Sequence, residues 1–180
     1  MRKLATAVAA LCLSTGLASA ETKPFNWTGF YGGVHAGWDI TEVSFGGPVG
    51  LSESALGYGV QIGFDYHLPG SQFVLGIAAD HTWTDAAVID KHWSVTGRAG
   101  VTFGHVMPYL LAGYKQADVL GTSLDGWVAG GGIEFGLTQS LFLAGEYRFT
   151  TYDLPSWLPA GIDAEAHEVR AVLKYKLNPL

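Results

Sequence analysis

From residue 30 to residue 177 the chain repeatedly alternates between apolar side chains and small or polar ones. Over 56–67 the even positions are Leu, Tyr, Val, Ile, Phe and Tyr, and the odd positions are Gly, Gly, Gln, Gly, Asp and His. A period of two is that of a β-strand whose two faces meet different surroundings. The pattern recurs in eight segments, approximately 30–40, 56–67, 73–83, 93–103, 109–116, 127–135, 141–149 and 169–177. The sequence therefore predicts an all-β protein with eight antiparallel strands.

The connections between these segments alternate in length. The long ones cover approximately 41–55, 85–92, 117–126 and 153–166, and the short ones cover 68–71, 105–107 and 137–140. No stretch of 18 consecutive apolar residues follows residue 20, so helical membrane spans are not expected. An even number of strands with alternating long and short connections is typical of an up-and-down transmembrane β-barrel, whose closure satisfies every backbone group in lipid.

Composition supports this fold class and excludes others. Only 14% of the 180 residues are charged, 48% are hydrophobic and 25 are glycine. A disordered chain has the opposite balance of charged and apolar residues. The formal net charge of -6 and the lack of a Lys/Arg cluster argue against a nucleic-acid partner.

The first 20 residues have the features of a secretory signal peptide. Arg2 and Lys3 precede an apolar run over 4–13, and Ala18-Ser19-Ala20 is a small-residue cleavage site. We therefore expect a signal peptide at 1–20 and one barrel domain at 21–180. Cys12 is the only cysteine, so the predicted mature chain has neither a disulfide nor a cysteine-based metal site.

Aromatic residues on the apolar face mark the two ends of the predicted strands. One set adjoins the long connections: Trp38, Tyr58, Trp83, Trp93 and Trp127. The other adjoins the short turns and chain ends: Phe30, Tyr66, Phe73, Phe103, Phe135 and Tyr175. Eight to ten residues separate the sets, or roughly 20–25 Å along the barrel axis, which matches two interfacial girdles around an apolar band. A soluble ligand-binding barrel is the alternative, but it would place the bulky aromatic rings inside and the glycines outside.

The polar face carries ten charges, five of each sign, and this face is expected to line the lumen. They are Asp65, Asp80, Glu134, Glu146, Glu168, Arg98, Lys115, Arg148, Arg170 and Lys174. Eight strands leave an interior that side chains just fill, and buried charges there must pair. We therefore predict a lumen closed by ion pairs, with Glu146 bound to Arg98, Arg148 or Arg170. A narrow charged pathway for small solutes is the functional alternative.

The histidines give little support for catalysis. His81 is the only one that the pattern places on the lipid face, and its neighbours in phase are apolar. A barrel lipase or a lipid A acyl-modifying enzyme would need a histidine with a serine or an acid on one exposed patch. A haem or metal site from His81 and His92 is a weaker alternative. No catalytic residue, metal site or cofactor is therefore predicted.

Three segments carry a family resemblance. They are 27–38 (WTGFYGGVHAGW), 126–153 (GWVAGGGIEFGLTQSLFLAGEYRFTTYD) and 169–177 (VRAVLKYKL). Together they resemble the small outer-membrane β-barrel proteins of alphaproteobacteria, the porin-family, opacity-like group. The resemblance implies an eight-stranded barrel with roles in envelope integrity and surface exposure and modest solute passage. It also implies haem binding in some relatives, and it supplies no catalytic residues.

Location and partners follow from this resemblance as expectations. The protein should lie in the outer membrane, in contact with lipid and lipopolysaccharide, and the assembly machinery should recognise its last strand. Outer-membrane barrels usually end in an aromatic residue, whereas here Leu177 is followed by Asn178, Pro179 and Leu180. Tyr175 is the nearest aromatic residue that could replace the missing terminal one.

Overall fold

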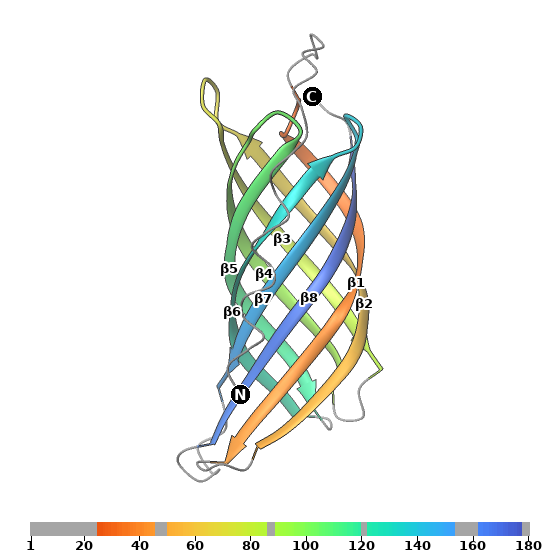
Figure 1. The fold of residues 1–180 in the computed structure, drawn as a ribbon, viewed down its shortest axis with the longest axis vertical. Coiled ribbons are helices and arrows are strands. Elements are labelled where there is room, and N and C mark those ends of the chain that lie inside the picture. Colours follow the sequence, from red (N-terminus) through yellow and green to blue (C-terminus); the bar gives the residue numbers. More distant parts are fainter. Residues whose placement is uncertain (1–24, 46–49, 86–88, 120–121, 154–161, 178–180) are drawn as a thin grey trace, which may run out of the picture.

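A computed structural model describes residues 25–45, 50–85, 89–119, 122–153 and 162–177. The predicted signal peptide at 1–20 lies outside the described residues. Within them the chain forms eight strands: β1 (Gly29–Phe45), β2 (Gly50–His67), β3 (Phe73–Thr84), β4 (Ile89–Val101), β5 (Val106–Val119), β6 (Thr122–Gly136), β7 (Leu141–Tyr152) and β8 (Ile162–Leu177). Each strand pairs antiparallel with the next, and β8 pairs with β1 to close the barrel (Figure 1).

The two ends of the barrel differ. The short connections 68–72, 102–105 and 137–140 lie at one end, called the turn end here, together with the start of β1 and the end of β8. The ends of β1, β3, β5 and β7 and the starts of β2, β4, β6 and β8 lie at the other end, called the loop end. Gly70 and Gly104 have φ angles of +71° and +66°, a left-handed conformation that glycine adopts without steric cost, and both lie in short turns.

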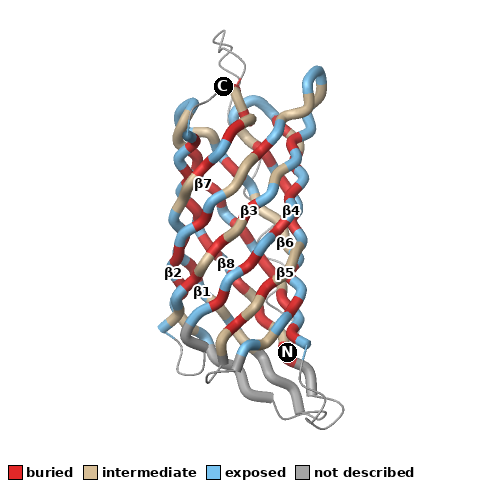
Figure 2. The backbone as a smooth tube through the Cα atoms, turned by 180° about the vertical axis from the view of Figure 1, so that it is seen from behind, coloured by how far each residue is buried: buried red, intermediate tan, exposed pale blue. Residues whose placement is uncertain are grey.

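Side chains alternate between the inside and the outside of the barrel along every strand. In β7 nearly every second residue is buried and the residues between are exposed, and Figure 2 shows the same alternation around the barrel. The exposed face carries large apolar residues, whereas the interior of the described barrel holds eleven charged side chains. This is the reverse of a soluble protein and confirms the predicted membrane-barrel fold. The described residues contain no helix long and apolar enough to cross a membrane.

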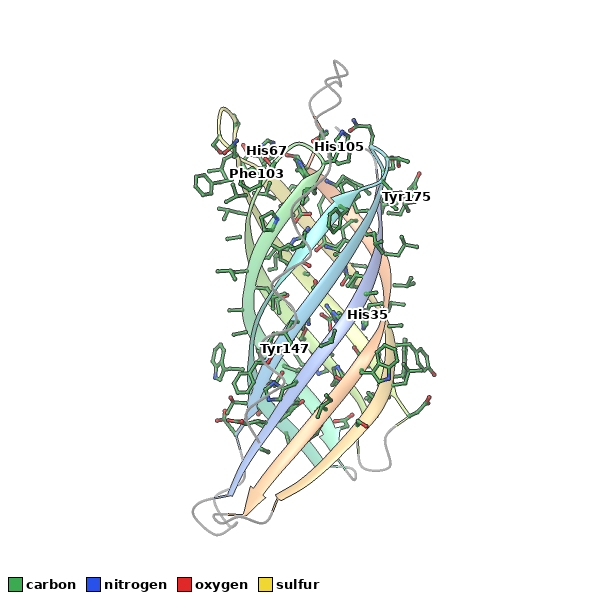
Figure 3. All side chains as sticks on the ribbon, in the orientation of Figure 1. His35, His67, Phe103, His105, Tyr147 and Tyr175 are labelled. Atoms are coloured by element: carbon green, nitrogen blue, oxygen red, sulfur yellow. The ribbon has the colours of Figure 1, made fainter. Side chains whose placement is uncertain are left out.

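All eleven predicted girdle residues lie on the outer face, and between 38% and 67% of the surface of each residue is exposed. Phe103 and Tyr175, labelled in Figure 3, lie near the turn end. Trp38 and Tyr58, by contrast, lie well inside β1 and β2. The strands therefore continue past the girdle on the loop side.

The predicted lengths of the long connections were wrong. The segment 41–55 was expected to be a connection, but β1 continues to Phe45 and β2 begins at Gly50, with Thr41 opposite Glu53. The segments 85–92, 117–126 and 153–166 likewise contribute residues to β4, β5, β6 and β8. Beyond the lipid the outer face meets water, so a strand there no longer needs alternating apolar residues. Backbone pairing continues where the sequence pattern stops.

The outer face of β4 offers a direct test of which surface meets lipid. Ala99 is exposed and lies near the middle of the apolar band. Ala99→Arg should lower the free energy of unfolding in lipid bilayers by about 2–4 kcal/mol, the cost of a lipid-facing arginine near the midplane. Ser54→Arg, on the outer face of β2 beyond Tyr58, is the matched control and should cost less than about 1 kcal/mol. Urea titrations of protein folded into vesicles would compare the two, and equal costs would contradict the assigned faces.

Candidate functional site

The lumen is filled by side chains rather than open. From the turn end toward the loop end it holds an apolar plug, then a network of charged groups, then a layer of histidine, hydroxyl and carboxylate groups. Each of the ten charges predicted to face inward is at most 7% exposed. The alternation of each strand brings these side chains to the same face, and the strand register decides which of them meet.

The apolar plug closes the turn end. Phe25 and Trp27 precede β1 and fold back into the barrel, where their rings are 5.1 Å apart and each lies 5.4 Å from the ring of Phe142. Gly136 makes room for this arrangement, because a Cβ at that position would overlap the Phe25 ring. The buried residues around them are Val74, Met107, Tyr109, Leu111 and Val128. Sequence reasoning missed the plug because Phe25 and Trp27 lie outside the alternating segments.

Lys176 ties the plug to the barrel wall. Its Nζ donates hydrogen bonds to the backbone carbonyls of Trp27 at 2.6 Å and Asn26 at 3.2 Å, and it lies 4.6 Å from the centre of the Phe142 ring. Lys176 was not among the predicted lumen charges, although it shares their phase on β8 with Lys174. The plug is therefore held by a buried cation as well as by apolar contacts.

The turn-side half of the charge network is built around Arg98. Its Nε donates to Oδ1 of Asp65 at 2.8 Å, a second bond joins the same two groups, and its Nη1 lies 2.8 Å from Oε2 of Glu134. Lys174 donates to the same Glu134 oxygen at 2.6 Å. Gly76 lies between Arg98 and Asp65 in the strand register and leaves the space through which the guanidinium reaches across β3.

The loop-side half of the network is built around Glu146. Its Oε2 accepts hydrogen bonds from Nε of Arg148 at 2.9 Å and from Nε of Arg170 at 2.8 Å. Arg148 also bonds Asp80 at 2.9 Å. Of the three partners predicted for Glu146, the structure thus selects Arg148 and Arg170, while Arg98 binds Asp65 and Glu134.

Further contacts join and extend the two halves. The Tyr109 hydroxyl donates to Oε1 of Glu146 at 2.6 Å, and its ring lies 5.1 Å from the guanidinium carbon of Arg98, so Tyr109 touches both halves. Toward the loop end, Glu168 lies 3.4 Å from Arg170 and 3.3 Å from Lys115. The charged groups therefore form a chain of contacts across the lumen.

The histidines separate onto different faces. His35, labelled in Figure 3, is buried, and its Nε2 lies 2.8 Å from the Thr82 hydroxyl. His81 packs edge-on against the outward ring of Trp83 at 4.7 Å, whereas His92 points inward and is 4% exposed. The hypothesis of a haem or metal site shared by His81 and His92 is wrong, because the wall of the barrel separates them.

Comparisons with known proteins agree with this architecture. A family model described as the outer membrane protein beta-barrel domain matches residues 5–176. The 25 kDa outer-membrane immunogenic protein of Brucella canis is 28% identical over 182 aligned residues, covering 88% of this chain and 84% of the relative.

Two solved structures share the fold at lower identity. Neisserial surface protein A has a TM-score of 0.51 and 20% identity, covering 82% of this chain and 97% of that one. The N-terminal β-barrel domain of Pseudomonas aeruginosa OprF has a TM-score of 0.50 and 12% identity, covering 78% of this chain and 97% of that one. At these identities the likeness shows the fold alone.

Proposed function

This chain belongs to the outer membrane protein beta-barrel domain family, and we propose that it serves the outer membrane as a closed barrel with a structural and surface role. In outer-membrane β-barrels the short turns face the periplasm and the long connections face the outside of the cell. The turn end is then periplasmic and the loop end extracellular. The strands that continue past the outer girdle extend the barrel wall beyond the lipid on this side.

The observation that carries this proposal is the filled lumen. The apolar plug and the charge network follow each other along the axis, and their members are almost fully buried. A hydrated ion would have to break ion pairs of 2.6–2.9 Å to pass the middle of the barrel. Solute passage, the alternative, would need these pairs to open.

Conductance measurements distinguish a closed barrel from a narrow porin. Purified protein inserted into planar lipid bilayers should leave the membrane without steady single-channel currents, because the plug and the charge network occupy the lumen. A porin of known conductance, inserted in the same way, is the positive control. Steady open-channel currents from the wild-type protein would contradict the closed barrel and favour solute transport.

The same packing favours a role without catalysis. A general acid or base must reach a substrate, yet Glu146 and Glu134 are buried and each binds two cationic groups. The outward His81 has an aromatic neighbour in Trp83 and lies on the apolar face. These surroundings suit a scaffold whose outer connections and apolar band make the contacts.

The expected partners follow from the outer surface. The band between the girdles would contact lipid, with lipopolysaccharide around its outer half.

Tyr175 lies on the outer face of β8 and is 57% exposed, where the assembly machinery could recognise it in place of a terminal aromatic residue. Tyr175→Ala should then lower the yield of folded protein in cells but not the yield of refolding in detergent.

Export through a cleaved signal peptide is part of the proposal. The mature protein should begin Glu21-Thr22-Lys23, because Ala18-Ser19-Ala20 fits the cleavage pattern. N-terminal sequencing of protein from the outer-membrane fraction would show this. Unboiled and boiled samples should migrate differently in SDS gels, as folded barrels do. An uncleaved N-terminus at Met1 would contradict the predicted signal peptide.

A further inference from the structure

Three potential metal ligands meet in the lumen on the loop side of the charge network. Asp39 comes from β1, His92 from β4 and Glu168 from β8, and each offers one ligand atom. These three atoms all lie within 4.8 Å of one another. β1 and β8 are neighbours, whereas β4 lies elsewhere in the barrel wall, so only the closed barrel brings the three groups together.

The imidazole of His92 is poorly satisfied without a ligand. The residue is 4% exposed, and its buried Nε2 has no hydrogen-bond partner among the described residues. A buried polar atom without a partner destabilises the fold, because it has lost its hydrogen bonds to water. An imidazole nitrogen at such a position is well suited to bind a cation.

The negative charges of Asp39 and Glu168 are only partly compensated by cationic neighbours. Asp39 and Glu168 are directly opposite each other in the antiparallel register of β1 and β8 and point to the same side. Like charges in this arrangement repel. Glu168 has Lys115 at 3.3 Å and Arg170 at 3.4 Å, but in the described part of the chain no hydrogen bond or ion pair is made by the Asp39 carboxylate.

The barrel wall leaves space for the Asp39 carboxylate. A Cβ added at Gly57, on the neighbouring strand β2, would lie 2.6 Å from Oδ2 of Asp39, so the glycine provides the space that this group occupies. Asp39 is only partly buried, whereas His92 and Glu168 are buried. Asp39 is therefore the most exposed of the three ligands.

We propose that Asp39, His92 and Glu168 form a binding site for a divalent transition-metal ion, with zinc as the best-fitting member. One imidazole and two carboxylates are ligands of the type that zinc takes, at about 2.0–2.2 Å, with water completing four-coordination. Such bond lengths place ligand atoms roughly 3.5 Å apart. The ligand atoms, which lie within 4.8 Å of one another, would have to approach by up to about 1.3 Å to enclose an ion.

Lys115 limits the affinity of this site. Its ammonium group forms an ion pair with Glu168, so a divalent cation must compete with it for this carboxylate. Each carboxylate has about four lone-pair positions, so Glu168 can bind a metal and keep a hydrogen bond. Replacing Lys115 with methionine removes the competing charge and should tighten metal binding.

The test uses the full mature chain, without an affinity tag, folded in detergent micelles and treated with a chelator. Isothermal titration calorimetry with Zn²⁺ should show one binding site per chain. Removing a ligand should weaken binding by at least about tenfold, since even the loss of a supporting contact to a ligand typically weakens it 10–100-fold. His92→Ala and Asp39→Asn are the ligand variants, and His81→Ala, an outward histidine on the neighbouring strand, is the matched control.

Each result bears on the proposal. One-site binding that His92→Ala and Asp39→Asn both weaken, that His81→Ala leaves unchanged and that Lys115→Met strengthens would support it. No Zn²⁺ binding by the wild-type protein, or equal binding by wild type and both ligand variants, would overturn it. Heat-dependent gel migration verifies that each variant is folded, and Asp39→Asn, at a partly exposed position, keeps the test valid if His92→Ala fails to fold.

Discussion

Replacing Glu146 with alanine should lower the free energy of unfolding in lipid bilayers by about 3–5 kcal/mol, the usual cost of leaving a buried charge without its partner. Glu146 is 6% exposed and accepts hydrogen bonds from Arg148 and Arg170 at 2.9 and 2.8 Å. After the change, Asp80 and Glu168 remain for these two guanidinium groups, and their contacts to Arg170 are longer, at 3.4 Å. Urea titration of vesicle-bound protein, followed by tryptophan fluorescence, would measure the loss.

Two further variants distinguish the effect of an unpaired buried charge from the effect of shortening a side chain. Asp118→Ala removes a carboxylate from an exposed ion pair with Lys91 at 3.7 Å and should cost at most about 1 kcal/mol. The double variant Glu146→Ala/Arg170→Met removes both charges and should be more stable than Glu146→Ala alone. Glu146→Ala should also increase ion leakage in planar bilayers. A loss no greater than that of Asp118→Ala would contradict the ion-paired lumen.

Replacing Trp27 with alanine should lower the free energy of unfolding by about 3–5 kcal/mol, as expected for a large aromatic side chain removed from a packed interior. Trp27 is 1% exposed, its ring packs against Phe25 and Phe142, and its Nε1 donates to the carbonyl of Gly104 at 3.3 Å. The same urea titration would measure the loss. Ion leakage should increase as well, because the plug closes the turn end.

Trp127→Ala is the matched control for this experiment. Trp127 belongs to the outer girdle, and 67% of its surface is exposed. Its removal deletes an interfacial contact but leaves no cavity inside the barrel, so the loss should be clearly smaller than for Trp27→Ala. If the two variants lost equal stability, the segment before β1 would contribute no more to the fold than a girdle residue.

The sequence alone was enough to predict the number of strands and the face that each central residue occupies. A strand turns successive side chains to opposite faces, and lipid outside and a packed polar interior inside demand opposite chemistry at alternate positions. Glu146, Arg148 and Arg170 could therefore be assigned to the lumen without a structure. Where the outer face meets water, as in 41–45 and 50–55, this demand ends, and the strands could not be recognised.

Tertiary structure alone decided which inward groups meet. Glu146 lies opposite Arg170 because of the register between β7 and β8, and Arg98 reaches Asp65 across Gly76 because of the registers of β2, β3 and β4. The meeting of Asp39, His92 and Glu168 depends on barrel closure in the same way, and the plug depends on a segment that folds back from outside the strands. Alternation is a local property that each strand carries in its own sequence. Register and closure arise from pairing between distant segments, which no single segment encodes.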